Sequence, residues 1–503
     1  MTASQDSQDD GLADFGYSQT LERSIGTFAS FAAGVSYISI LTGTFQLFYF
    51  GFAFGGPAYW WSWPLVFAGQ ITVALCFAEL AGRYPVAGSV YNWSKRLAGP
   101  TTSWLAGWMM LTASVVTLTA VVLAYQITLP QIWAGFQLVG DGSGATDFAV
   151  SAVIWGAILI LFTTIVNAFG VKLMSRINST GVFIELVAAV VLIVLLAVNI
   201  VNPPSVLFDT QNLGAGHSSG YLGAFLVAAL ASAYVMYGFD TASSLGEETM
   251  EPRRTAPTAI LRAVIASFVI GGLILGLAIL AAPDLSDPQI AESGLQYIVL
   301  TVLGGGVGTV FLIAVIVAVT VCALAVHTAA IRLMFAMARD NALPGGVRLA
   351  HIHPRFRTPL VPAVVIGVAA LLILVVNIGT PEIFTAVTSV AIIMIYVAYL
   401  LVTAPMLLKR LRREWPDAGA GQGHFSLGRW GLPVNVVAVV WGAAMALNLA
   451  WPRADVYGEG VLSWIAFIFI GLVAALGLVW YLLRGRHRVG TLPEHVAKQM
   501  EGA

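Results

Sequence analysis

The feature that most limits the fold of this 503-residue chain is a series of long apolar runs. An apolar run of about 20 residues can cross the hydrocarbon core of a bilayer as an α-helix. Such runs follow one another along nearly the whole chain, with polar loops between them. The chain is therefore predicted to be an all-α polytopic membrane protein with about 12 transmembrane helices. We place the spans at Ser24–Phe48, Ser62–Gly82, Thr102–Leu129, Phe148–Asn167, Leu173–Val198, Leu222–Glu247, Thr258–Ala281, Gly308–Ala338, Val361–Asn377, Ile383–Leu408, Val434–Leu449 and Val461–Leu483.

Composition excludes several other classes of protein. The chain is only 10% charged, whereas a soluble chain carries about 25% charged residues. It has no basic patch of the kind that binds nucleic acid, so no nucleic-acid partner is expected. The two cysteines, Cys76 and Cys322, lie in separate apolar runs without metal-ligand spacing, so no metal site is predicted.

The positions of Lys and Arg predict the orientation in the membrane, because cytoplasmic loops are enriched in both. The basic residues fall in alternate loops, and the intervening loops hold only Arg453. Both termini are therefore predicted to be cytoplasmic in the plasma membrane. Residues 1–22 lack the basic and apolar regions of a signal peptide. We read them as a polar tail, 23–483 as one transmembrane domain and 484–503 as a second tail.

Span one contains small and hydroxyl residues, SYISILTGT at 36–44, where a membrane helix usually has Leu or Val. Glycine permits backbone conformations that a helix excludes. A break here would start the outer half-helix near Thr42 and Gly43, with free N–H groups suited to a substrate carboxylate. The alternative is a small-residue face that packs against another helix.

Span six contains a second candidate break, YGFDT at 237–241. Non-helical backbone at membrane depth persists only where it is buried in protein or lines a cavity. The carbonyls of Tyr237 and Gly238 would then suit an ammonium group. Asp240 either caps the inner half-helix or contacts a cation. Phe239 either packs in the core or forms a lid. Interrupted helices at corresponding positions of two halves are typical of a transporter site.

Glu185 lies deep in span five. An acid at this depth is costly unless it is paired or hydrated. It is either a proton-titrating coupling residue or a hydrogen-bonded structural acid. Coupling to H+ or Na+ would follow from the first interpretation.

Three further acids lie nearer the predicted cytoplasmic ends of their spans: Glu79, Glu247 and Glu248. Ion pairs with Arg332 or Arg339 would make them part of an inner gate or a structural contact. His327 is expected to be a hydrogen-bonded residue of the bundle rather than a proton carrier. No P-loop, zinc-protease or nucleophile-elbow motif occurs, so the chain is not expected to be an enzyme or to hold a cofactor.

Three stretches carry a family resemblance: FAELAGRYPVAGSVYNWSKRLAGP, YGFDTASSLGEETMEPRRTAPTAI and IRLMFAMARDNALP. On these motifs the chain resembles the amino acid–polyamine–organocation permeases, and within them the amino acid/choline transporter branch. The resemblance implies a LeuT-like fold with discontinuous helices one and six. Two inverted repeats of five spans, about 24–198 and 222–408, would precede two extra helices at about 434–483.

The resemblance also implies roles for individual residues. The span-one break of the family receives the substrate carboxylate, which here maps onto Ser39, Ile40, Thr42 and Gly43. The span-six break receives the amino group, which maps onto Tyr237, Gly238 and Phe239, with Phe239 as a gating aromatic. Many relatives have a lysine at the position of Glu185. The reversed charge means that their coupling scheme does not carry over.

The expected function is secondary active transport of an amino acid or related amine, such as 4-aminobutyrate, by alternating access. No obligate protein partner is predicted. A choline or polyamine carrier, in which Asp240 meets the cation, is an alternative. A membrane amino-acid sensor that binds without transport is an alternative of another class.

Overall fold

The computed structural model describes residues 19, 21, 23–141, 144–216, 219–376, 378, 383–416 and 425–489. Within these residues the regular structure is helical, apart from one isolated bridge between Ile25 and Thr249. Ten of the described helical stretches are long and apolar enough to cross a membrane. Two shorter apolar helices stand where spans six and nine are predicted. The predicted all-α polytopic architecture is confirmed.

The helices follow the predicted order of spans. The first five spans are α2 (Thr27–Ile38) with α3 (Ile40–Gly55), α4 (Ser62–Arg83), α6 (Pro100–Ile132), α7 (Ala145–Ala168) and α8 (Val171–Val198). The next five are α9 (Tyr221–Val235) with α10 (Thr241–Ser244), α11 (Pro252–Ala281), α12 (Pro288–Arg339), α14 (Leu360–Val376) and α15 (Ile383–Leu411). The last two are α16 (Gly431–Ala450) and α18 (Ile465–Leu483), and the short helices α5 (Ser89–Ala98), α13 (Gly346–Leu349) and α17 (Ala454–Tyr457) lie in loops.

Two glycines with positive φ decide where spans separate. Gly56, at φ 59°, ends α3, so the chain enters a short 3₁₀ turn before α4. Gly304, at φ 75°, lies inside α12 and separates residues 288–303 from the span that ends at Arg339. The glycine run at 304–308 therefore begins with a turn rather than continuing one straight helix.

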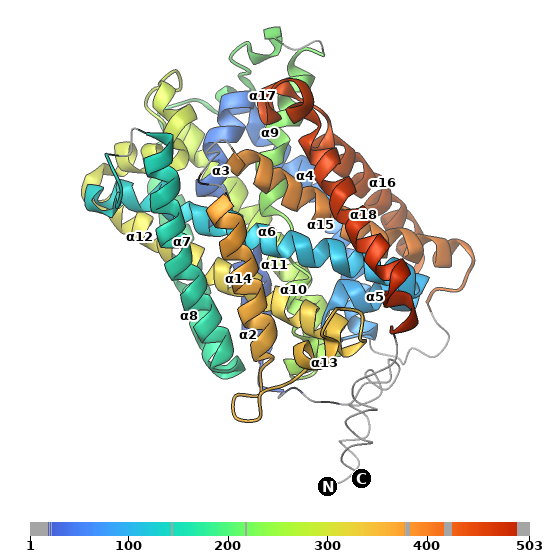
Figure 1. Ribbon diagram of the computed structural model, residues 1–503. Coiled ribbons are helices and arrows are strands. Elements are labelled where there is room, and N and C mark those ends of the chain that lie inside the picture. Colours follow the sequence, from blue (N-terminus) through green and yellow to red (C-terminus); the bar gives the residue numbers. More distant parts are fainter. Residues whose placement is uncertain are drawn as a thin grey trace.

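The two discontinuous helices lie at the centre of the bundle. The outer half of span one, α3, packs against α9, and the inner half, α2, packs against α10. Helix α12 contacts both α3 and α6. Figure 1 shows α6 crossing the middle of the bundle, with α7 and α8 along one edge and α16 and α18 along the other. The breaks are thus enclosed by long continuous helices.

The outermost helices present apolar side chains to their surroundings. Phe183, Val190 and Val194 of α8 are more than half exposed, and so are Leu476 and Val479 of α18. A protein in water rarely leaves a large continuous apolar surface uncovered. These faces are suited to contact with lipid chains.

Loops that carry basic residues meet on one face of the bundle, which we call the terminal face. It includes Ser24, Lys95, Ala168, Glu248, Asp340 and Thr358. Backbone and side-chain bonds connect its loops: Ser24 and Ile25 N–H to the Glu248 carbonyl at 2.9 Å, Lys95 to Asp340 at 2.5 Å, and Thr358 Oγ1 to the Ala168 carbonyl at 3.1 Å. On the opposite face the Ala58 N–H donates to the Asp209 carbonyl over 3.0 Å. The loops that the positions of Lys and Arg assign to one side therefore do lie together.

Candidate functional site

The break in span one is a single residue, Ser39. Its φ of 40° and ψ of 90° end α2 at Ile38 and let α3 begin at Ile40. The expected start near Thr42 and Gly43 is too late, because the Gly43 N–H already donates to the Ser39 carbonyl over 2.9 Å. A Cβ at Gly43 would meet the side chain of Val235, so this glycine lets α3 approach α9. It does not form the break.

The start of α3 is occupied by the carboxylate of Glu185 from α8. Glu185 Oε1 accepts hydrogen bonds from the Leu41 N–H over 3.1 Å and from Ser39 Oγ over 3.2 Å. Ser39 Oγ also lies 2.6 Å from Thr42 Oγ1. A helix N-terminus favours an anion through its free N–H groups and its dipole. The sequence singled out both features, but not that they meet.

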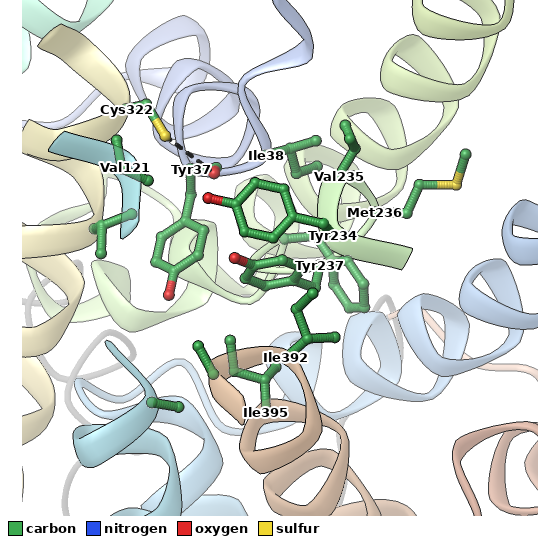
Figure 2. Packing of buried hydrophobic residues seen from close by; sticks show 14 of the residues in the cluster. Tyr37, Ile38, Val121, Tyr234, Val235, Met236, Tyr237, Cys322, Ile392 and Ile395 are labelled. Carbon is green, nitrogen blue, oxygen red and sulfur yellow. Dashed lines mark hydrogen bonds between the residues drawn. The ribbon is translucent and has the colours of Figure 1, made fainter. Parts of the chain in front are cut away.

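The surroundings of Glu185 leave half of its carboxyl group unsatisfied. The side chain is 0% exposed, and Oε2 has no hydrogen-bond partner among the described residues. Close by, the Cys322 thiol donates to the Tyr37 carbonyl at the end of α2 over 3.6 Å, as Figure 2 shows. Burial of a polar atom without a hydrogen-bond partner costs free energy, so such atoms are rare in the interior of folded proteins.

The break in span six occupies residues 236–240. Gly238 has φ 82°, and the ring of Tyr37 lies where a side chain at Gly238 would be. Only glycine fits both conditions. The inner half-helix is shorter than predicted, since α10 ends at Ser244 and a 3₁₀ turn follows. One reason for the short helix is that hydroxyl residues such as Ser243 and Ser244 favour helix ends over helix interiors. The chain after α10 also packs closely, because a Cβ at Gly246 would lie 2.9 Å from the backbone of Pro85.

Asp240 does not cap α10, so that interpretation is wrong. It stands at the N-cap position, but its side chain makes no capping hydrogen bond. Its Oδ1 accepts from the Tyr399 hydroxyl over 2.6 Å and its Oδ2 from Ser89 Oγ over 3.2 Å. The Tyr399 hydroxyl in turn accepts from the Gly238 N–H over 3.0 Å. Sequence reasoning missed Tyr399, because it lies in the apolar pattern of α15.

Aromatic side chains fill the space between the two breaks. Tyr237 makes edge-on contacts with Tyr37 and Tyr234, at ring-centroid distances of 6.0 and 5.8 Å. Figure 2 shows these three rings together with Ile392 and Ile395 from α15. Such edge-on pairs are favourable beyond their burial.

Phe239 lies in a neighbouring aromatic group. It is 0% exposed, and its ring centroid is 5.4 Å from that of Tyr399 and 5.9 Å from that of Phe77. In this conformation Phe239 is therefore packed inside the bundle. A role as a lid requires that it leave these contacts.

Two buried ion pairs lie near the terminal face. Arg339 donates to both carboxyl oxygens of Glu247 at 2.7 and 3.0 Å, and Glu247 Oε1 also accepts from the Ala87 N–H at 2.9 Å. Arg332 donates to Glu248 at 3.0 Å. All four side chains are at most 2% exposed. These partners are the ones expected for Glu247 and Glu248.

Two other predicted residues have different surroundings. Glu79 pairs with Arg410 of α15, so its expected pairing with Arg332 or Arg339 is wrong. His327 lies 3.0 Å from Thr163 Oγ1 and 3.0 Å from the Ala363 carbonyl, as a hydrogen-bonded bundle residue would. The described residues contain no group of three or more His, Cys, Asp or Glu that could hold a metal ion.

Comparison with known proteins agrees with this arrangement of two broken helices in an apolar bundle. A family profile described as amino acid permease matches residues 25–475. The chain belongs to the amino acid permease family. This family is part of the amino acid–polyamine–organocation superfamily, so the resemblance drawn from the motifs is confirmed. The permease is a membrane-embedded transporter of a small molecule.

Several curated proteins are similar to the permease over nearly all of its length. Amino-acid permease BAT1 of Arabidopsis thaliana is 28% identical over 95% of this chain and 94% of its own. The methylthioribose transporter of Bacillus subtilis (strain 168) is 29% identical over 93% and 95%. The thiamine transporter thi9 of Schizosaccharomyces pombe is 26% identical over 88% and 80%.

A solved structure supports the fold. The crystal structure of MhsT in complex with L-phenylalanine matches with a TM-score of 0.56 and 15% sequence identity. The match covers 90% of the permease and 99% of MhsT. The permease therefore has the predicted LeuT-like fold.

Proposed function

We propose that the permease binds an amino acid or related amine of the 4-aminobutyrate type between its two helix breaks. The substrate carboxylate would approach the start of α3 at Ser39, Ile40, Thr42 and Gly43. The ammonium group would meet the carbonyls of Tyr237, Gly238 and Phe239, near Asp240. The observation that carries this proposal is the pairing of α2 with α10 and of α3 with α9, which brings both breaks to one place.

We further propose that transport is coupled to a proton through Glu185. Its carboxyl group is fully buried, has one oxygen without a partner among the described residues, and contacts the break in span one. Na+ is the alternative coupling ion, since a carboxylate with a free oxygen also suits a hard cation. No resident cofactor is proposed.

Alternating access would follow from movements at two places. Phe239 would leave its aromatic contacts to admit the substrate from one side. The ion pairs Glu247–Arg339 and Glu248–Arg332 would separate to open the other. We propose that the terminal face is cytoplasmic, with both termini on that side, and that the protein works in the plasma membrane without an obligate partner protein.

Uptake by the purified full-length chain in proteoliposomes tests the function. Labelled 4-aminobutyrate should accumulate against its gradient when the outside is acidic, and it should be recovered chemically unchanged. Competition should include neutral amino acids, choline, methylthioribose and thiamine, because relatives are named for the last two. Binding without accumulation would instead identify a sensor. A Glu185→Gln variant whose uptake still follows the pH gradient would exclude Glu185 as the coupling residue.

A further inference from the structure

The start of α3 already holds an anion that belongs to the protein. Glu185 Oε1 accepts hydrogen bonds from the Leu41 N–H and the Ser39 hydroxyl, which are among the first donors of this half-helix. The carboxylate of an amino acid would approach the same helix end. Two carboxylates at one helix N-terminus repel each other, and burial strengthens the repulsion because little water screens it.

In the part of the chain that the structure describes, no basic side chain bonds to Glu185 to offset this repulsion. Its hydrogen bonds among the described residues run to the Ser39 hydroxyl and to backbone N–H groups at the start of α3. Helix α8 packs against α2, α7, α11 and α12. The ionisable group on these helices that interacts with Glu185 is Cys322 on α12, whose thiol donates to the backbone carbonyl of Tyr37. No hydrogen bond or ion pair described joins Glu185 to any other charged or histidine side chain of these helices or of α8. These side chains are Lys172 and Arg176 on α8, Asp147 on α7, Arg253, Arg254 and Arg262 on α11, and Glu292, His327, Arg332 and Arg339 on α12.

Protonation at Oε2 of Glu185, which has no partner among the described residues, would remove the repulsion between the two carboxylates. A neutral carboxyl group keeps one oxygen as an acceptor for Leu41 and Ser39, and its other oxygen carries an O–H donor. That donor has nothing to bond to in the described part of the chain. An incoming carboxylate oxygen would satisfy it with a strong, charge-assisted hydrogen bond.

We propose that Glu185 and the substrate carboxylate share the start of α3, so that a substrate with a carboxylate binds together with one proton, whereas an amine without a carboxylate binds without one. The inference rests on the proposed function and makes Glu185 a determinant of specificity as well as of coupling. By linkage, the bound carboxylate and the bound proton each favour the other. The proton comes from bulk water and is transferred to Oε2, and no bond in the substrate is broken.

Binding of 4-aminobutyrate and of 4-aminobutanamide to the purified full-length permease tests the inference. The two probes differ only in whether the carboxylate is present. Calorimetric titrations would run from about pH 5 to 8, where perturbed carboxyl groups titrate. In the upper part of this pH range, the Kd of 4-aminobutyrate should rise about tenfold per pH unit, because binding is linked to the uptake of one proton. The Kd of the amide should not rise. Titration in buffers of different ionisation enthalpy should show uptake of one proton for the acid and none for the amide.

Two variants separate the shared site from general effects of pH. Glu185→Gln retains an oxygen acceptor for Leu41 and Ser39 but cannot titrate, so it should bind 4-aminobutyrate with a Kd independent of pH. Glu79→Gln removes a buried acid that lies outside both breaks and should keep the tenfold slope. If Glu185→Gln does not fold, the proton count of the unmodified protein still decides the question.

The outcomes also separate this inference from the proposed function. Equal pH slopes for the acid and the amide, or a slope that persists in Glu185→Gln, would overturn the inference while the permease still binds and transports. Failure of both probes to bind, together with no uptake of any amino acid, would overturn the proposed function and the inference with it.

Discussion

The hydroxyl of Tyr399 donates to Oδ1 of Asp240 over 2.6 Å, across 159 residues of sequence. Because the same hydroxyl accepts from the Gly238 N–H, one side chain from α15 bonds to both the middle and the end of the break in span six. Ser89, at the start of α5, bonds to the other oxygen of Asp240. The break therefore has a defined shape in this conformation.

Replacing Tyr399 by Phe should destabilise the permease by about 1–3 kcal/mol, because a buried carboxyl group and a backbone N–H each lose a partner. Uptake should fall as well, since the break would no longer keep its shape. Thermal unfolding and initial uptake rates measure the two effects. Tyr59→Phe is the matched control, because the buried Tyr59 hydroxyl has no hydrogen-bond partner among the described residues. If both variants lose the same stability, the hydroxyl of Tyr399 has no special role.

Glu247→Gln should lower the free energy of unfolding by about 3 kcal/mol, because it leaves the Arg339 guanidinium buried without its counter-charge. Arg339→Gln should lower it by a similar amount, because the Glu247 carboxylate is then buried without its counter-charge. The double variant should be more stable than the sum of the single effects predicts, and a double-mutant cycle from denaturation curves measures the difference. Additive effects would show that the pair is not energetically coupled.

Gly238→Ala should reduce stability and transport together. The position has φ 82°, where a Cβ is disfavoured by about 1–2 kcal/mol, and the Tyr37 ring occupies the space that a Cβ needs. Gly471→Ala in α18 is the control, because a Cβ there meets no atom within 4 Å. That change should raise stability by about 0.5–1 kcal/mol, as expected for Gly to Ala inside a helix. Unchanged uptake by Gly238→Ala would argue that the span-six break does not shape the site.

Ile25→Pro should loosen the N-terminal segment from the terminal face. It removes an N–H that donates to the Glu248 carbonyl over 2.9 Å, a bond that contributes about 1 kcal/mol. Hydrogen exchange at Thr249 and Met250 should accelerate, because the Met250 N–H donates to the Ile25 carbonyl in the same contact. Exchange on the opposite face, for example at Ala58, should not change.

Much of the fold could be predicted because long apolar runs, basic loops and interrupted helices are local features of sequence. The position of each break was harder. The outer half-helix was expected to start near Gly43, because glycine tolerates non-helical backbone. In the structure Ser39 adopts the positive φ, and Gly43 packs against Val235. A residue that tolerates an unusual conformation is not always the one that uses it.

Partners far apart in the chain could not be predicted from these patterns. Glu79 pairs with Arg410 rather than with Arg332 or Arg339, since α15 approaches α4 only in the folded bundle. Tyr399 likewise reaches Asp240 only through the packing of α15 near the centre. Periodicity identifies which residues lie in a span, but tertiary packing decides which side chains meet.

The ion pairs of Glu247 and Glu248 have a consequence for how the terminal face opens. Their side chains are at most 2% exposed, so the mobile ions that screen surface charges over about 8 Å do not reach them. A slight parting of the helices would separate these charges before water could hydrate them. Partial opening is therefore disfavoured, and the face should switch between shut and fully wetted states, at a rate that depends little on ionic strength.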